Sequence, residues 1–134
     1  MTGPRHAFRQ QAGQRAEEAA RRYLQARGWA ILACNFRRRS GEIDLVAKDP
    51  QGTVVFVEVR ARRAWGGEPG LVRAAASVDR QKQARIIRAA RAVYAGRPDL
   101  AQLPARFDVV TVELSAAGEP GAVRHVPAAF DLNG

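Results

Sequence analysis

The sequence contains very little cysteine, histidine or lysine. Cys34 is its single cysteine, which excludes a disulfide framework and a zinc site built from cysteines. The two histidines, His6 and His125, have no partner at a catalytic or metal-binding spacing, so we assign neither as a base or zinc ligand. Lys48 and Lys82 are the only lysines, and arginine supplies the remaining positive charge. Arginine therefore dominates the positive charge of this chain.

Long apolar runs are missing as well. No stretch approaches the ~20 residues that cross a bilayer, and residues 1–11 lack the apolar segment of a secretory signal peptide. The sequence also has no basic amphipathic helix with a bulky apolar face, the pattern of a helix that lies on a membrane. We therefore expect a cytoplasmic protein with no membrane partner.

The charge of the chain is strongly of one sign. Lys and Arg number 22 against 13 Asp and Glu, which gives a formal net charge of +9. This balance favours a polyanionic partner, and nucleic acid, with DNA first, before a membrane. Arginine-rich chains also arise from GC-rich genomes, so composition alone does not identify the partner.

The length predicts one domain, covering residues 11–134, preceded by a flexible basic arm at residues 1–10. Apolar spacing predicts helices at 13–27 and 77–94, the second with Ser77 as its N-cap. Strands are expected at 29–34, 42–47, 53–61 and 107–112, with 123–126 as a weaker fifth candidate and a mobile loop at 64–76. The order αβββαβ, with the second and third strands paired as a hairpin, predicts an α/β fold in which helices flank a mixed sheet.

Two strings place carboxylates at the ends of predicted strands: GEIDLV at 41–46 and FVEVR at 56–60. Side chains alternate across a strand, so Glu58 and Arg60 share one face. Apolar residues precede Glu58, so its carboxylate is expected where a buried strand emerges at a sheet edge or cleft. The alternative interpretation is a set of surface carboxylates neutralised by nearby arginines.

Asp44 and Glu58 are the candidate ligands for Mg²⁺ or Mn²⁺. Magnesium prefers oxygen ligands, with one or two carboxylates and several waters, and the carbonyl of Val59 would supply a further oxygen. Glu17 borders the apolar stripe of the first predicted helix and is the candidate third carboxylate, with a solvated helix residue as the alternative. A bound metal would lower the pKa of a water and hold phosphate oxygens. Arg60 would stabilise the charge that develops on the phosphate.

Several basic residues are candidates for contacts with nucleic-acid phosphates. Those that follow the Glu58 strand are better candidates than the stripe on the second predicted helix, which a solvated face explains as well. The full set is Arg62, Arg63, Arg37, Arg38, Arg39, Lys82 and Arg85. Asp108, at the start of a predicted strand, is interpreted as structural.

The two strings resemble the YraN-like family of bacterial proteins. The resemblance covers roughly residues 13–113 and extends to Gly13, Asn35, Gly66-Gly67, Lys82-Gln83 and the segment 106–110. It implies a restriction-endonuclease-like core, similar to archaeal Holliday-junction resolvases, whose catalytic signature is an Asp, then an acidic residue, any residue and Lys. Asp44, Glu58 and the helix carboxylate Glu17 match that pattern, whereas Arg60 stands at the lysine position.

The sequence thus predicts a Mg²⁺-dependent or Mn²⁺-dependent nuclease that hydrolyses phosphodiester bonds in DNA, with branched or damaged DNA as candidate substrates. The alternative is a catalytically inactive nucleic-acid-binding protein that keeps the nuclease fold, because Arg60 replaces the lysine that would activate water. A third hypothesis is an interaction protein whose charge is incidental. The sequence leaves the oligomeric state open between a monomer and a homodimer.

Overall fold

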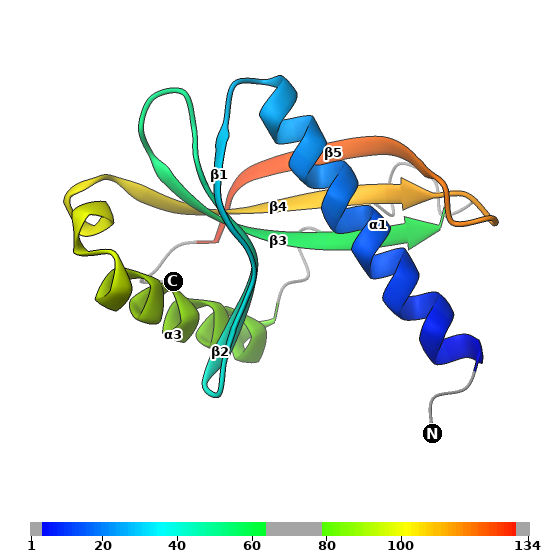
Figure 1. The fold of residues 1–134 in the computed structure, drawn as a ribbon, viewed down its shortest axis with the longest axis horizontal. Coiled ribbons are helices and arrows are strands. Elements are labelled where there is room, and N and C mark those ends of the chain that lie inside the picture. The colour runs from blue at the N-terminus through cyan, green and yellow to red at the C-terminus, as the bar shows by residue number, and fades with distance from the viewer. Residues whose placement is uncertain (1–3, 64–78, 131–134) are drawn as a thin grey trace.

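A five-stranded mixed sheet with helices on both faces forms the fold (Figure 1). The computed structural model describes residues 4–63 and 79–130, with side chains from residue 12 onwards within those ranges. Its elements, in chain order, are α1 (Pro4–Ala26), β1 (Ala30–Arg38), β2 (Gly41–Lys48), β3 (Val54–Arg63), α3 (Arg80–Gly96), the 3-10 helix η2 (Pro98–Gln102), β4 (Ala105–Leu114) and β5 (Pro120–Phe130). The predicted α/β order is confirmed, and the weaker strand candidate is part of β5.

The strands lie in the order β1-β2-β3-β4-β5, so each strand neighbours the next along the chain. All neighbouring pairs are antiparallel except β3 and β4, which are parallel. A parallel pair requires a crossover connection, and α3 with η2 supplies it. The predicted hairpin of β2 and β3 is present, with Val46 opposite Phe56.

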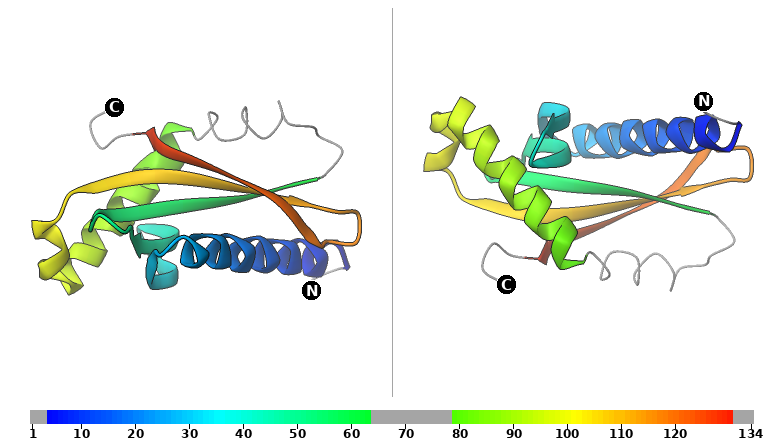
Figure 2. Two further views of the ribbon diagram at one scale, coloured as in Figure 1. Left: turned by 90° about the horizontal axis from the view of Figure 1, so that it is seen from above. Right: turned by 90° about the horizontal axis from the view of Figure 1, so that it is seen from below.

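The two helices cover opposite faces of the sheet (Figure 2). Alternate residues of the central strand β3 face them, Val55 and Val57 towards α1 and Val54 and Phe56 towards α3. The buried helix residues that meet these strands are, from α1, Ala16, Ala20 and Leu24 and, from α3, Ile86, Ala89, Ala90 and Val93. Over the described ranges, neither helix has an apolar stretch long enough to cross a membrane.

Both helices begin at residues other than those predicted. α1 starts at Pro4, so residues 4–10, expected as a basic arm, form its first turns. Proline fits there because the first N–H groups of a helix have no intrahelical partner. α3 starts at Arg80, and its N-cap is Asp79 rather than Ser77, since the Asp79 carboxylate accepts the N–H of Lys82 at 2.8 Å. Serine and aspartate cap equally well, so local sequence does not separate them. The predicted mobile loop lies outside the described residues.

The tip of the β1–β2 hairpin packs directly on the backbone of α3. Gly41 is buried, and a Cβ atom placed there would lie 2.0 Å from the carbonyl oxygen of Arg85 and 3.1 Å from the nitrogen of Ala89. Only glycine allows two backbones to approach so closely. This contact holds the start of β2 against the first turns of α3, the region where the candidate site forms.

Candidate metal centre

Asp44 and Glu58 lie where β2 and β3 separate. The pairing of the two strands ends at Leu45, and beyond it the Asp44 carboxylate accepts the backbone N–H of Val59 at 2.8 Å. Ile43 packs in the cluster beneath α3, whereas Leu45 packs in the cluster beneath α1. Residues two apart share a face in a regular strand, so β2 changes direction at Asp44. The carboxylate therefore occupies the fork between the strands.

Glu17 reaches the same fork from α1. Burial, together with the negative charge of Asp44 and a hydrogen bond to it, raises the pKa of Glu17 to about 7. Asn35 also hydrogen-bonds Glu17, and its place between the Cys34–Leu45 and Phe36–Ile43 pairs sets it opposite Asp44. Asn35 has a φ of 51°, a conformation that asparagine adopts more readily than most residues. Asn35 had no predicted role, although its place directly after the predicted strand 29–34 was a signal.

Glu58 is buried, with 7% of its surface exposed. Burial and the negative charge of Asp44 raise the pKa of Glu58 to about 7, against the opposing effect of Lys82. The ammonium of Lys82, from α3, lies 3.4 Å from Oε1 of Glu58 and 3.2 Å from Oε1 of Glu42. Burial alone would lower the pKa of Lys82, but the charge of Glu58 and the contact with Glu42 outweigh it, so the pKa is raised. Lys82 is thus held as a cation.

Carboxylates from α1, β2 and β3 therefore converge on one place. Within residues 4–63 and 79–130, no group of three or more His, Cys, Asp and Glu side chains has the arrangement of a ready-made metal cage. Magnesium does not need one, because one or two carboxylates with waters suffice. Carboxyl groups whose pKa is raised by a like-charged neighbour hold protons that a divalent cation would displace. Glu58 and Glu17 fit Mg²⁺ or Mn²⁺ on this ground, and Asp44 is the charged neighbour that both share.

Comparison with known proteins identifies the family of this chain. The model of the uncharacterised protein family UPF0102 matches residues 16–112, from α1 to β4. The chain belongs to this family. UPF0102 proteins similar to it include one from Ralstonia nicotianae, 50% identical over 107 residues that make up 75% of this chain and 76% of that protein. One from Trichlorobacter lovleyi is 43% identical over 124 residues, 92% of each chain. One from Halorhodospira halophila is 52% identical over 103 residues, 77% of this chain and 78% of that protein.

The UPF0102 match confirms the predicted YraN-like membership and contains every predicted site residue. The fold brings four of these residues together: Glu17, Asp44, Glu58 and Lys82. Lys82, predicted as a phosphate contact, lies against carboxylates. Arg60 is half-buried further along β3, and Arg62 and Arg63 are exposed towards the end of that strand. The carbonyl of Val59, predicted as a metal ligand, belongs to the same residue as the N–H that binds Asp44.

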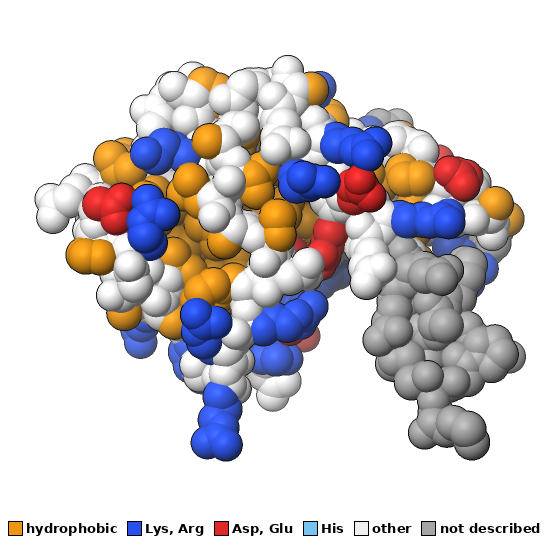
Figure 3. All heavy atoms as spheres, viewed as in Figure 1, with side chains coloured by type: hydrophobic (Ala, Val, Ile, Leu, Met, Phe, Trp, Pro, Cys, Tyr) orange, Lys and Arg blue, Asp and Glu red, His pale blue; other side chains and the backbone are white. Residues whose placement is uncertain are grey.

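A basic surface adjoins the carboxylates in this UPF0102 protein. It comprises Arg37, Arg38, Arg39, Arg85 and Arg88, and we call it the hairpin basic surface. The hairpin tip and α3 are joined there, since Nε of Arg88 donates to the carbonyl of Ser40 at 3.1 Å and Arg37 pairs with Glu42. Figure 3 shows Lys and Arg side chains gathered over the β1–β2 hairpin and the adjacent α3. Positive charge therefore borders one side of the fork.

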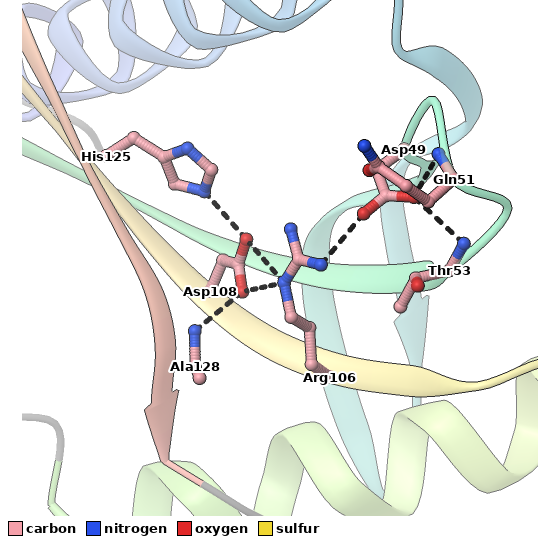
Figure 4. A network of polar contacts seen from close by, with 7 residues as sticks. All are labelled: Asp49, Gln51, Thr53, Arg106, Asp108, His125 and Ala128. Carbon is pink, nitrogen blue, oxygen red and sulfur yellow. Dashed lines mark hydrogen bonds and ion pairs between the residues drawn. The ribbon is translucent and has the colours of Figure 1, made fainter.

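A second polar network lies at the opposite end of the β2–β3 hairpin (Figure 4). Asp108 is fully buried and accepts hydrogen bonds from Nε of Arg106 at 3.0 Å and from the N–H of Ala128 at 2.9 Å. Nε2 of His125 lies 2.7 Å from the same carboxylate, and Arg106 also binds Asp49 at 2.8 Å. Burial acts to raise the pKa of Asp108, but these partners outweigh it and the pKa is lowered.

Spacing along the chain gave His125 no partner, but the fold places its ring beside Asp108. Antiparallel pairing of β4 with β5 sets Val110 opposite His125 and brings the ring to Asp108. Such a contact depends on strand register, which spacing along the chain does not reveal. The network ties β5 and the β2–β3 turn to β4, which is a structural task.

Proposed function

We propose that this protein is a metal-dependent nuclease that hydrolyses phosphodiester bonds in DNA. The observation that carries the proposal is the convergence of Asp44 and Glu58 at the fork between β2 and β3, with Glu17 beside them. The likeness of this pattern to the restriction-endonuclease-like signature supports it, as does the position of Glu58 where the buried part of the central strand β3 ends.

Asp44 and Glu58 would hold Mg²⁺ or Mn²⁺, together with the Val59 carbonyl. When bound, such an ion supplies a water of lowered pKa and neutralises phosphate oxygens. In phosphodiester hydrolysis a water oxygen would bond to phosphorus while the bond from phosphorus to the leaving sugar oxygen breaks. One water proton ends on that sugar oxygen, and the other stays with the new phosphate group. Arg60, on the face of β3 that carries Glu58, donates to phosphate oxygens and cannot act as a base.

DNA is the substrate that the charge of the protein favours. The formal net charge is +9, and the hairpin basic surface lies beside the carboxylates. Arg62 and Arg63 extend positive charge along β3 from the other side of Glu58. Contacts of this kind go to phosphates and carry no base sequence. Branched and damaged DNA are the substrates to test first.

A nucleic-acid-binding protein without catalysis is the second candidate, and Arg60 is the observation in its favour. The nuclease signature has lysine at that position, and a guanidinium does not deprotonate in proteins. Arg60→Lys separates the two candidates. If the wild type is inert and Arg60→Lys cleaves, the chain is a nuclease fold disabled at one position.

The test of the proposed function is incubation with duplex, flap, single-stranded and four-way-junction DNA, with Mg²⁺ or Mn²⁺ and with chelator. We expect cleavage of at least one substrate, abolished by chelator and in the Asp44→Asn/Glu58→Gln double variant. Asp99→Asn is the matched control, since Asp99 is exposed and pairs with Arg97. Salt-sensitive binding with no cleavage would favour the binding-only candidate, and no binding would favour an interaction protein.

A further inference from the structure

The Lys82 side chain extends from the first turn of α3 to carboxylates of two strands. Its ammonium lies 3.2 Å from Oε1 of Glu42 and 3.4 Å from Oε1 of Glu58. The Lys82 side chain is 28% exposed and the Glu58 side chain is 8% exposed. A lysine that serves solubility keeps its ammonium in water. Here the ammonium faces the most enclosed part of the carboxylate site.

Two independent features fix Lys82 in this position. The Asp79 carboxylate accepts the backbone N–H of Lys82 at 2.8 Å, which sets the start of the helix. One turn later, the carbonyl of Arg85 contacts the backbone of Gly41, where a Cβ atom would lie only 2.0 Å away. The helix is therefore anchored before and after Lys82, and the residue that follows Gly41 is Glu42. The ammonium is held by the fold, as a preorganised charge requires.

We propose that Lys82 is a catalytic residue, whose ammonium donates to a non-bridging oxygen of the scissile phosphate. This inference rests on the proposed nuclease function. An ammonium has three N–H donors, and among the described residues Glu42 and Glu58 engage two of them. The third donor serves the substrate. A fixed positive charge beside Glu58 offsets the negative charge that builds on the phosphate as water attacks.

Lys82 contacts Glu58 from α3, whereas Arg60 lies two residues beyond Glu58 along β3. Val54 and Phe56 face α3, and the alternation of β3 continues this face through Glu58 to Arg60. A phosphate seated at Glu58 therefore meets Arg60 from the strand and Lys82 from the helix. Lys82 supplies the positive charge that the nuclease signature places at position 60. Arg60 contributes to holding the substrate.

The experiment compares wild type with Lys82→Met, Lys82→Arg and the matched control Lys48→Met, which removes the other lysine from the far end of β2. The substrate is the best DNA of the panel, used with Mn²⁺, and Mn²⁺ binding is measured separately by calorimetry. We expect Lys82→Met to lower kcat by about 10²-fold while KM for DNA and Mn²⁺ binding change little. Lys82→Arg should restore part of the rate, and Lys48→Met should behave as wild type.

A phosphorothioate at the scissile phosphate tests the contact itself. Sulfur in place of the oxygen that Lys82 contacts should slow cleavage by the wild type. This effect should shrink in Lys82→Met, because the effects of changing two groups that contact each other are not additive. A wild-type rate in Lys82→Met, or an undiminished sulfur effect, would overturn the role of Lys82 and leave the nuclease proposal standing. Loss of Mn²⁺ binding along with the rate would assign Lys82 to metal-site integrity instead. A wild type that cleaves no substrate would overturn both proposals.

Discussion

The carboxylate of Asp44 accepts the backbone N–H of Val59 at 2.8 Å, so β3 itself holds this side chain at the fork. The bond needs only an acceptor oxygen, which asparagine also provides, whereas metal binding needs the negative charge. Substitutions at Asp44 can therefore separate the structural task from the proposed metal-binding task.

Asp44→Asn should keep the free energy of unfolding of the metal-free protein near the wild-type value and weaken Mn²⁺ binding by calorimetry. Removing a carboxylate from a cluster of like charges can even stabilise the metal-free protein. Asp44→Ala should weaken Mn²⁺ binding equally and cost about 1 kcal/mol in addition, because the Val59 N–H loses its partner. Identical Mn²⁺ titrations for wild type and Asp44→Asn would rule out the metal centre.

The raised pKa values of Glu17 and Glu58, each about 7 in the fold against an ordinary 4.5, predict a pH-dependent stability. The folded state holds these protons more tightly than the unfolded chain, so their stabilising contribution is complete below pH 4.5 and is lost as the pH rises to 7. As the pH rises from 4.5 to 7, the melting temperatures of Glu58→Gln and Glu17→Gln should therefore rise relative to that of the wild type.

Glu18→Gln is the control for this pH series, because Glu18 neighbours Glu17 but pairs with Arg22 on the exposed side of α1. Its difference from wild type should not grow between pH 4.5 and 7. Added Mn²⁺ should raise the melting temperature of wild type more at pH 8 than at pH 5.5, since the ion competes with protons. A metal effect that is the same at both pH values would contradict binding by these carboxylates.

Gly41→Ala should destabilise the protein by about 1–3 kcal/mol or more, the range for forcing atoms into a packed site. The added Cβ would meet the Arg85 carbonyl at 2.0 Å, and neither backbone can yield without moving the hairpin or α3. Gly13→Ala is the control, and it should stabilise the protein. No atom lies within 4 Å of its added Cβ, and alanine favours a helix over glycine by about 1 kcal/mol. Urea unfolding of both variants measures the contrast.

Asp108→Asn should lower the free energy of unfolding by about 3 kcal/mol, because it removes the charge that pairs with Arg106 inside the fold. The pKa of Asp108 is lowered in the folded state, so its contribution is present at neutral pH and is lost as the pH falls through that lowered value. The melting temperatures of Asp108→Asn and wild type should therefore converge in acid. Equal stabilities at pH 7 would show that the charge of Asp108 contributes nothing to the stability of the network in Figure 4.

DNA binding should weaken steeply with salt, with a log–log slope near −0.9 for each phosphate neutralised on duplex DNA. Replacing Arg62 and Arg63 together by glutamine should make that slope shallower by about 0.9 for each phosphate that the variant no longer neutralises. The control is the Arg21→Gln/Arg22→Gln pair on α1, whose side chains pair with Glu18. Fluorescence anisotropy at several salt concentrations gives the slopes, and equal slopes for both double variants would count against a DNA path along β3.

Much of the fold could be predicted because its signals are local. Apolar alternation located β2 and β3, and the same alternation placed Glu58 at the emerging end of a buried strand. Capping was less informative, since Ser77 and Asp79 are both acceptable N-caps. Only the hydrogen bond from Lys82 N–H to Asp79 identifies where α3 begins.

The sequence by itself determined which chemical groups are present, the order of the elements and the carboxylates that two neighbouring strands carry. The tertiary structure decided which groups meet. Lys82 reaches Glu58 because Gly41 lets the hairpin pack on α3, and His125 reaches Asp108 because β5 pairs with β4 in one register. The periodicity of apolar residues indicates which residues of one element are buried, whereas these contacts depend on how separate elements pack together. No local pattern encodes that packing.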